Sequence, residues 1–369
     1  MLTQMSSQPG FCGRLSPAQR AAYERDGFLR LPGFFAREEV EPLGRACRAD
    51  PELEGALLAV ADSAGNPQEV VSWTALSDDL VGVMPRVARL VEAAEDLVGG
   101  AVYHWHSKLS MKKPGSAGRW DWHQDYGYWY DEGCLRPDMI TCTIAIDAAF
   151  RENGCLQLVR GSHRLGRIDH KPIGQASGVD PERLALIQKN YETVECVMEP
   201  GDAMFFHCNT LHSSGPNLSA APRTLLHCSY NAADNEPYLS EGQEHHKYRP
   251  LDKLPDSAIR EGRYVSIFSH QAFRQPDPEI GTNNYGYKML KLSRRPRIAA
   301  KGKDYLSEQA SALHRSLPLQ WARARLGVKS VTWRLKRQAA QQAGAGAGCA
   351  HGVAHEQAFD GGQAVDGAQ

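Results

Sequence analysis

The sequence predicts a mainly β protein with flanking helices. Many short segments alternate apolar and polar residues or are rich in β-branched residues, as strands are, and capped helical patterns stand mostly near the start. At 369 residues, the chain is long enough for one β-rich core with helical additions. A net charge of -1, with 42% hydrophobic and 23% charged residues, is ordinary for a globular protein and predicts no strong attraction to nucleic acid or membranes.

The first part of the chain is expected to alternate helices and a strand. Ser16 caps a helical segment that has proline at its first position and stops at Gly27. A short strand is expected over Gly27–Phe35, followed by a helix over Arg37–Arg48 and another over Val81–Leu97, each with apolar residues for the core.

The middle of the chain supplies most of the expected strands. Ile173–Gly178 is loop-like in composition, and a helix is expected from Pro181 to about Asn190. The expected strands are Ala101–Met111, Met139–Asp147, Cys155–Val159, Glu192–Glu199, Ala203–Phe206 and a last one that opens at Arg223.

One stretch, Trp120–Tyr130, combines possible metal ligands with a dense run of aromatic residues. His123 and Asp125 stand two residues apart, so on a strand they would point to the same face and leave Gln124 on the other. An imidazole beside a carboxylate is half of the 2-His-1-carboxylate arrangement that holds Fe(II) on one face of an octahedron. Because a lone His-x-Asp pair also arises by chance, a distal histidine is needed.

A second segment offers that histidine. Glu199–Ser214 reads as a Pro-Gly turn, an apolar strand, a short polar turn and then His212, and Arg223 follows eleven residues later. His207, within the preceding strand, is the rival ligand.

These motifs, with ENGCLQLVRGSH over 152–163 and PGD over 200–202, resemble the phytanoyl-CoA dioxygenase family of Fe(II)- and 2-oxoglutarate-dependent oxygenases. The resemblance covers roughly Ala21 to Asp234. The local sequence is more similar to bacterial members of the ectoine-hydroxylase type than to the acyl-CoA enzyme. The resemblance implies a double-stranded β-helix, or jelly-roll, core. The eleven-residue spacing to Arg223 favours His212 over His207, for which it would be sixteen.

The resemblance also implies the site and the reaction. Iron would be bound by His123, Asp125 and His212, and 2-oxoglutarate by Arg223, with Ser214 as a hydrogen-bond partner of the same carboxylate. O2 would be the other co-substrate, and hydroxylation of an unactivated C–H bond of a small organic metabolite would give succinate and CO2. A carboxylate at position 125 argues for hydroxylation rather than halogenation.

Further residues are candidates for the pocket. His104, His106 and Lys108 share one parity on their expected strand, from which Lys108 could reach the co-substrate; the two histidines form a rival metal site that lacks a third ligand at informative spacing. Thr143 lies where the family tends to have a co-substrate contact. The aromatic run either fills the barrel or forms a substrate wall. The substrate-lining candidates are Gln124, Tyr128, Trp129 and His227.

The remaining observations concern organisation and setting. The nine cysteines form no C-x-x-C pair and predict reduced thiols in the cytoplasm, and neither a signal peptide nor a membrane span is expected. The expected organisation is a flexible N-terminus (1–15), an oxygenase domain (16–285), a basic helical extension (286–338) and a disordered tail (339–369).

Two other functions stay open. Lys288–Arg337 carries fourteen Lys or Arg residues against two acids, so the barrel could be catalytically idle and the basic segment the working surface. The second open function is a cupin-like metal isomerase that does not use 2-oxoglutarate. In that case, Arg223 would be dispensable. The expected partner is a small-molecule substrate, nucleic acid is not expected, and the sequence does not determine the oligomeric state.

Overall fold

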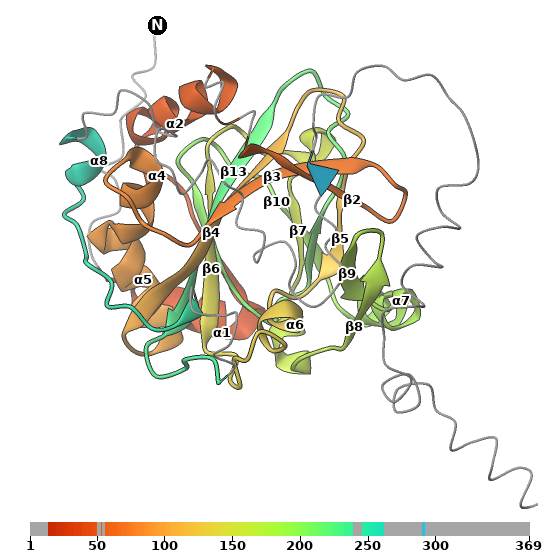
Figure 1. Cartoon of the computed structure of the whole chain (residues 1–369). Helices are drawn as coiled ribbons and strands as arrows, with labels where there is room; N and C mark the ends of the chain where they lie inside the picture. The colour runs from red at the N-terminus through yellow and green to blue at the C-terminus, as the bar shows by residue number, and fades with distance from the viewer. Residues whose placement is uncertain (1–13, 50–52, 54–55, 239–245, 262–289, 292–369) are drawn as a thin grey trace, which may run out of the picture. The chain divides into compact units, whose positions relative to one another are not determined.

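The structure, a computed structural model, describes residues 14–49, 53, 56–238, 246–261 and 290–291 (Figure 1). These residues belong to one compact unit, Met1–Arg295. Nearly all of the predicted N-terminal segment 1–15 and basic extension 286–338, and the whole predicted tail 339–369, lie outside the described residues.

Two antiparallel sheets form the core, and together they make the jelly-roll fold that the sequence analysis predicted. The larger contains β1 (Phe28–Leu31), β2 (Leu58–Ala61), β3 (Pro67–Trp73), β4 (Val102–Lys112), β6 (Met139–Ala145), β11 (Ala203–His207), β13 (Arg223–Ala232) and β14 (Leu290–Lys291). Its strand order is β1-β11-β6-β13-β4-β3-β2-β14. The smaller contains β5 (Trp120–His123), β7 (Leu156–Val159), β10 (Thr193–Cys196) and β12 (His212–Ser214), in the order β10-β7-β12-β5.

Helices cover the outer face of the larger sheet (Figure 1). They are α1 (Pro17–Asp26), α2 (Arg37–Ala49), α4 (Leu80–Val83), α5 (Ala88–Val98) and α8 (Ala258–Glu261). Their apolar sides bury Val40, Leu43 and Leu90 against outward residues of the sheet such as Leu226. This packing leaves the inner face of the sheet free to line a cavity.

Local sequence explains the helix ends. Ser16 caps α1 by accepting a hydrogen bond from the Gln19 backbone, and Gly27 ends the helix at φ 82°, a conformation that favours glycine. The single helix expected over Val81–Leu97 is wrong: Pro85 cannot donate a backbone hydrogen bond, and the chain forms α4, a 3-10 turn (Met84–Arg86) and then α5.

The other short elements lie around the smaller sheet. They are α6 (Tyr126–Trp129), α7 (Pro181–Asn190), the 3-10 turns Arg151–Asn153 and Ser162–Leu165, and the hairpin of β8 (His170–Ile173) and β9 (Ala176–Val179). The loop expected over Ile173–Gly178 is therefore wrong; Gly174, at φ 59°, turns the hairpin. The strand expected over Gly27–Phe35 ends early, at Leu31, because a Pro-Gly turn follows.

The state of the cysteines and the length of the helices bear on the expected setting of the protein. Seven cysteines fall within the described residues and all are free thiols, six of them buried. Within the described ranges, no helix combines the length and apolar character that a membrane span needs.

Candidate metal centre and active site

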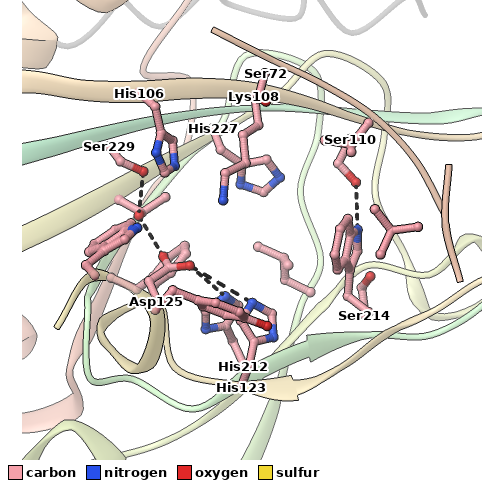
Figure 2. Close-up of a pocket in the computed structure, with 18 of the residues that line it drawn as sticks. Ser72, His106, Lys108, Ser110, His123, Asp125, His212, Ser214, His227 and Ser229 are labelled. Atoms are coloured by element: carbon pink, nitrogen blue, oxygen red, sulfur yellow. Dashed lines mark hydrogen bonds and ion pairs between the residues drawn. The ribbon is translucent and has the colours of Figure 1, made fainter. Parts of the chain in front are cut away.

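Three of the predicted ligands converge between the two sheets (Figure 2). His123 ends β5, and His212 opens β12 as its direct cross-strand partner. Asp125 was expected to lie on the same strand as His123, but the strand ends before it. Asp125 has helical backbone angles, φ -58° and ψ -39°, and starts α6. The turn nevertheless brings its carboxylate to the imidazoles, and the ligand atoms of the three residues lie within 4.8 Å of one another.

Backbone hydrogen bonds orient both imidazoles. Nδ1 of His123 lies 2.7 Å from the carbonyl oxygen of Asp121, and Nδ1 of His212 lies 2.9 Å from that of Thr210. A carbonyl only accepts, so each Nδ1 carries the proton and each Nε2 keeps a lone pair for a metal. The two Nε2 atoms lie 4.0 and 3.8 Å from Oδ1 of Asp125.

The carboxylate is held in the same way. Oδ2 of Asp125 accepts a hydrogen bond of 2.9 Å from the Thr141 hydroxyl, which lies 3.0 Å from the Ser229 hydroxyl. Thr141 and Ser229 are cross-strand partners on β6 and β13, so the larger sheet fixes a ligand that belongs to a turn. Oδ1 is left to face the imidazoles.

Electrostatics keep His123 and Asp125 in the protonation states that a metal requires. Burial, and next the nearby His212, hold the pKa of His123 well below its usual value, so the imidazole is neutral at pH 7. Burial alone would raise the pKa of Asp125, but His212, Lys108 and His123 outweigh it and lower the pKa. The site therefore presents a neutral imidazole on His123 and an ionised carboxylate on Asp125.

Gln124 lies between two ligands and does not line the cavity, which corrects its prediction as a substrate contact. It is fully buried. Its amide nitrogen donates to the carbonyl oxygens of Gly166 (2.8 Å) and Asn209 (2.6 Å), and its amide oxygen accepts from the Ile168 backbone (2.7 Å). Asn209 precedes His212 in the same turn, so Gln124 connects the two ligand-bearing segments.

At the other end of the cavity stands Arg223, the first residue of β13 and only 1% exposed. One guanidinium nitrogen donates to the carbonyl oxygen and hydroxyl of Ser110, at 3.2 and 3.3 Å. Nε and the other terminal nitrogen are buried and have no partner among the described residues, and neither has the hydroxyl of Ser214. Burial lowers the pKa of Arg223 to about 9, which leaves it charged at neutral pH.

A β-bulge determines what strand β4 presents to the cavity. Ser229 pairs with His106, whereas Tyr230 pairs with His104, so Trp105 is an extra residue. His106 and Lys108 consequently line the cavity, but His104 contacts the Tyr230 ring on the helix-covered side. The expectation that the three side chains share a face is therefore wrong for His104.

The remaining predicted residues divide between cavity and interior. Tyr128, Trp129 and His227 line the cavity. Thr143 does not; it is fully buried, and its hydroxyl lies 2.8 Å from Nδ1 of His227. His207 receives a hydrogen bond from the Asn209 backbone, and the only group of three potential ligands in the described part of the chain contains His212 instead.

Several cavity residues were not predicted as site residues. Glu132 follows α6, and His246 lies in the segment after residue 245; the two side chains are 3.7 Å apart. Neither has a motif around it that would have revealed it, because each reaches the cavity from a loop. Thr141 had a signal, since it shares strand parity with the predicted Thr143.

The cavity holds about 120 Å³, several times what one water molecule needs. Its apolar wall includes Val70, Leu156 and Phe206 from both sheets. A jelly roll with two imidazoles and a carboxylate on one face of a cavity, and a buried arginine beyond them, defines the class of non-haem metal oxygenases.

The comparisons with known proteins identify the family within that class. Residues 23–225 match the phytanoyl-CoA dioxygenase (PhyH) family, and the chain belongs to it. The protein is therefore an enzyme of the 2-oxoglutarate-dependent dioxygenase class.

Individual relatives support this assignment to the family and the enzyme class. Ectoine dioxygenase of Bordetella parapertussis is 31% identical over 273 residues, which cover 66% of this chain and 88% of that protein. L-Proline trans-4-hydroxylase of Streptomyces griseoviridis is 30% identical over 241 residues, covering 59% and 87%. EctD from S. alaskensis has been solved with bound Fe (TM-score 0.54, 25% identity, 65% and 87% covered) and with 2-oxoglutarate and 5-hydroxyectoine (TM-score 0.50, 27% identity, 67% and 86% covered).

Proposed function

We propose that the protein uses Fe(II), 2-oxoglutarate and O2 to hydroxylate an unactivated C–H bond of a small organic metabolite, with succinate and CO2 as co-products. The observation that carries the proposal is the pairing of two features in one cavity: a triad of metal ligands, and a buried arginine with unsatisfied donors. Each would be costly to keep without its ligand.

The residues fit an iron ion. His123 and His212 would each supply an Nε2 atom and Asp125 an ionised oxygen, which is the donor set that suits non-haem Fe(II) and leaves positions for other ligands. When bound, iron would supply the chemistry of O2 activation. The protein's own task is to orient the ligands and to exclude water.

The residues also fit 2-oxoglutarate. A carboxylate beside Arg223 would accept from Nε and the free terminal nitrogen, and the Ser214 hydroxyl would donate to it, so that the unsatisfied groups would all be paired. Ser214 lies two residues beyond His212 on β12, about 7 Å along the strand. That separation suits a short dicarboxylic acid that reaches from the metal to the arginine.

The test is an anaerobic titration of the protein with Fe(II) and 2-oxoglutarate, following the weak visible charge-transfer band of the chelate. Wild type is expected to develop the band, Asp125→Ala to lose it, and Arg223→Ala to need far more 2-oxoglutarate. If iron binds to wild type and no band develops at any 2-oxoglutarate concentration, the oxygenase proposal fails.

The same two variants, assayed for turnover and for partner binding, separate the two alternatives. A metal isomerase without 2-oxoglutarate would turn over normally as Arg223→Ala. A binding module that works through Lys288–Arg337, which lies almost wholly outside the described residues, would keep its binding when Asp125 is replaced. Small-molecule specificity is supported by the relatives, whose names refer to ectoine and proline.

A further inference from the structure

A hairpin outside the two sheets packs against the turn that carries the metal ligands. It consists of β8 and β9, which form a two-stranded sheet of their own, and Figure 1 shows it beside β5. The hydroxyl of Tyr128, in α6, donates to the carbonyl oxygen of Ser177 in β9. The Tyr128 ring also contacts the ring of His170, the first residue of β8, with centroids 5.0 Å apart. The hairpin is therefore joined to the segment directly after Asp125.

His170 makes a second contact, with the peptide group between His123 and Gln124. The backbone N–H of Gln124 donates to Nε2 of His170 at 3.1 Å. Since Nε2 accepts, the proton of the neutral ring is on Nδ1, which lies 3.4 Å from the hydroxyl oxygen of Ser177. Burial lowers the pKa of His170 to about 4, so the ring is neutral at pH 7 and able to accept.

This peptide group lies at the change from extended to helical backbone. His123 is the last residue of strand β5, and Asp125 already has the helical angles that start α6. The orientation of the peptide therefore sets how the two ligand side chains are placed relative to each other. β5 is the edge strand of the smaller sheet among the described residues, so His170 supplies an acceptor from outside the ladder.

The turn leaves room for the imidazole at Gly127. A Cβ atom on Gly127 would lie 2.2 Å from Cε1 and 2.3 Å from Nε2 of His170, closer than a side chain allows. The Gly127 N–H also donates to the carbonyl oxygen of Gln124, at 3.1 Å. The close approach of His170 to this backbone thus depends on glycine, which is an observation separate from the hydrogen bond to Gln124.

We propose that His170 is a positioning residue of the metal centre, which fixes the turn between His123 and Asp125 so that both ligands meet the metal. It acts through the backbone N–H of Gln124. The inference rests on the metal site of the proposed function and extends its support to a hairpin outside the two sheets. Contacts of this kind hold the orientation of metal ligands, and their loss weakens metal binding.

His170 acts neither as a metal ligand nor as a contact of the substrate. The potential ligands whose atoms lie within 4.8 Å of one another, in the part of the chain that the structure describes, are His123, Asp125 and His212. Among the described residues, those that line the cavity do not include His170. Its effect on the reaction must therefore pass through the turn that it supports.

The experiment compares two substitutions of nearly equal size. His170→Gln keeps a hydrogen-bond acceptor near the position of Nε2, whereas His170→Met places a methyl group there. Co(II) is the probe, because its visible absorption spectrum reports coordination geometry and its titration reports affinity, without any turnover. We expect His170→Met to bind Co(II) about 10-fold more weakly with an altered spectrum, and His170→Gln to restore both the spectrum and an affinity within about 3-fold of wild type.

A second variant tests the same contact from the other side. Gly127→Ala places a methyl group where the His170 ring lies, so it should reproduce the weaker Co(II) binding and altered spectrum of His170→Met, and it keeps the proposal testable if that variant does not fold. One matched control is Gly100→Ala, where a Cβ meets open space. The other is His104→Met, which removes two hydrogen bonds far from the metal turn. Both controls should keep Co(II) affinity within about 2-fold of wild type.

Two results would overturn the proposal. One is equal Co(II) affinity and equal spectra for His170→Met and His170→Gln, since a role in folding alone would lower the urea midpoint of both without separating their metal sites. The other is a wild-type Co(II) spectrum in Gly127→Ala. Either result leaves the proposed oxygenase function standing, because that function is tested by the charge-transfer band of wild type with Fe(II) and 2-oxoglutarate.

Discussion

The two ends of the cavity differ in how far the protein completes them by itself. At the metal end, each of His123, His212 and Asp125 has a hydrogen-bond partner that fixes its orientation. At the other end, Arg223 and Ser214 keep buried groups that lack a partner among the described residues. One end is preorganised before its ligand arrives, and the other is completed by the ligand. We expect substitutions at the metal end to change the coordination geometry. At the Arg223 end, we expect them to change the affinity for 2-oxoglutarate and the stability of the ligand-free protein.

The largest expected effect comes from the distal ligand. His212→Gln should lower turnover on the order of 1,000-fold and abolish tight Fe(II) binding, because the triad loses a neutral nitrogen donor. His207→Gln is the matched control, five residues earlier in the same segment, and should keep turnover within about 3-fold. Turnover assays with metal titration would check both; the reverse pattern would mean that His207 is the ligand.

The next effect concerns the incomplete end. Arg223→Met should raise the KM for 2-oxoglutarate on the order of 100-fold and leave Fe(II) affinity unchanged, since a charge-assisted pair is lost. Without ligand, the variant should be as stable as wild type or more stable, by about 1–3 kcal/mol, because unsatisfied buried donors are removed. Thermal unfolding with and without 2-oxoglutarate tests this; a variant that 2-oxoglutarate still stabilises as strongly as wild type would contradict it.

A smaller effect tests preorganisation directly. Gln124→Leu removes three hydrogen bonds, of which the one to Asn209 joins the two ligand-bearing segments, and metal affinity should fall by about 10-fold, as for other supporting contacts of metal ligands. Gln188→Leu, on the exposed face of α7, is the control. Co(II) absorption spectra should show altered coordination in Gln124→Leu alone; identical spectra for both variants would limit Gln124 to a role in folding.

The last expected effect is a pH dependence of stability at the incomplete end. Lys112 donates to the backbone carbonyls of Gly118 and Gly215, and burial, then the charge of Arg223, lowers its pKa from 10.5 to about 6. Between these values the unfolded chain binds the proton and the folded chain does not, so this contribution to stability is lost as pH falls from 10.5 to 6. Urea unfolding from pH 6.5 to 9.5 should show a steeper rise for wild type than for Lys112→Met. Equal slopes would show that Lys112 stays charged.

Sequence patterns predicted a mainly β fold and the candidate metal ligands, because donor chemistry and spacing are local properties, and the family resemblance added the jelly roll and the choice of His212. They did not predict how Asp125 converges: a turn, rather than strand parity, brings it to the imidazoles. They also missed Glu132 and His246, which reach the cavity from loops whose course depends on tertiary packing. The assignment of Lys108 to 2-oxoglutarate and the domain boundaries stay predictions.

Two of the incorrect predictions could have been avoided from signals in the sequence. Pro85 should have divided the expected helix over Val81–Leu97, because proline lacks the donor that a helix interior requires. Gln124 is predicted as a substrate-lining residue, although its expected strand parity points away from the two ligands. The structure agrees with the parity: Gln124 points away from the cavity and joins the backbone segments behind it.

The extra residue in β4 has a consequence for how such an enzyme can diversify. Since Trp105 breaks the alternation, the inward residues from His106 onward keep their register with β13, while those before it follow a different one. Substitutions over residues 102–105 can therefore reshape the aromatic stack under His246 and leave the metal-facing ladder unchanged. The bulge separates the part of the strand that supports the cavity wall at His246 from the part that carries the metal-facing ladder.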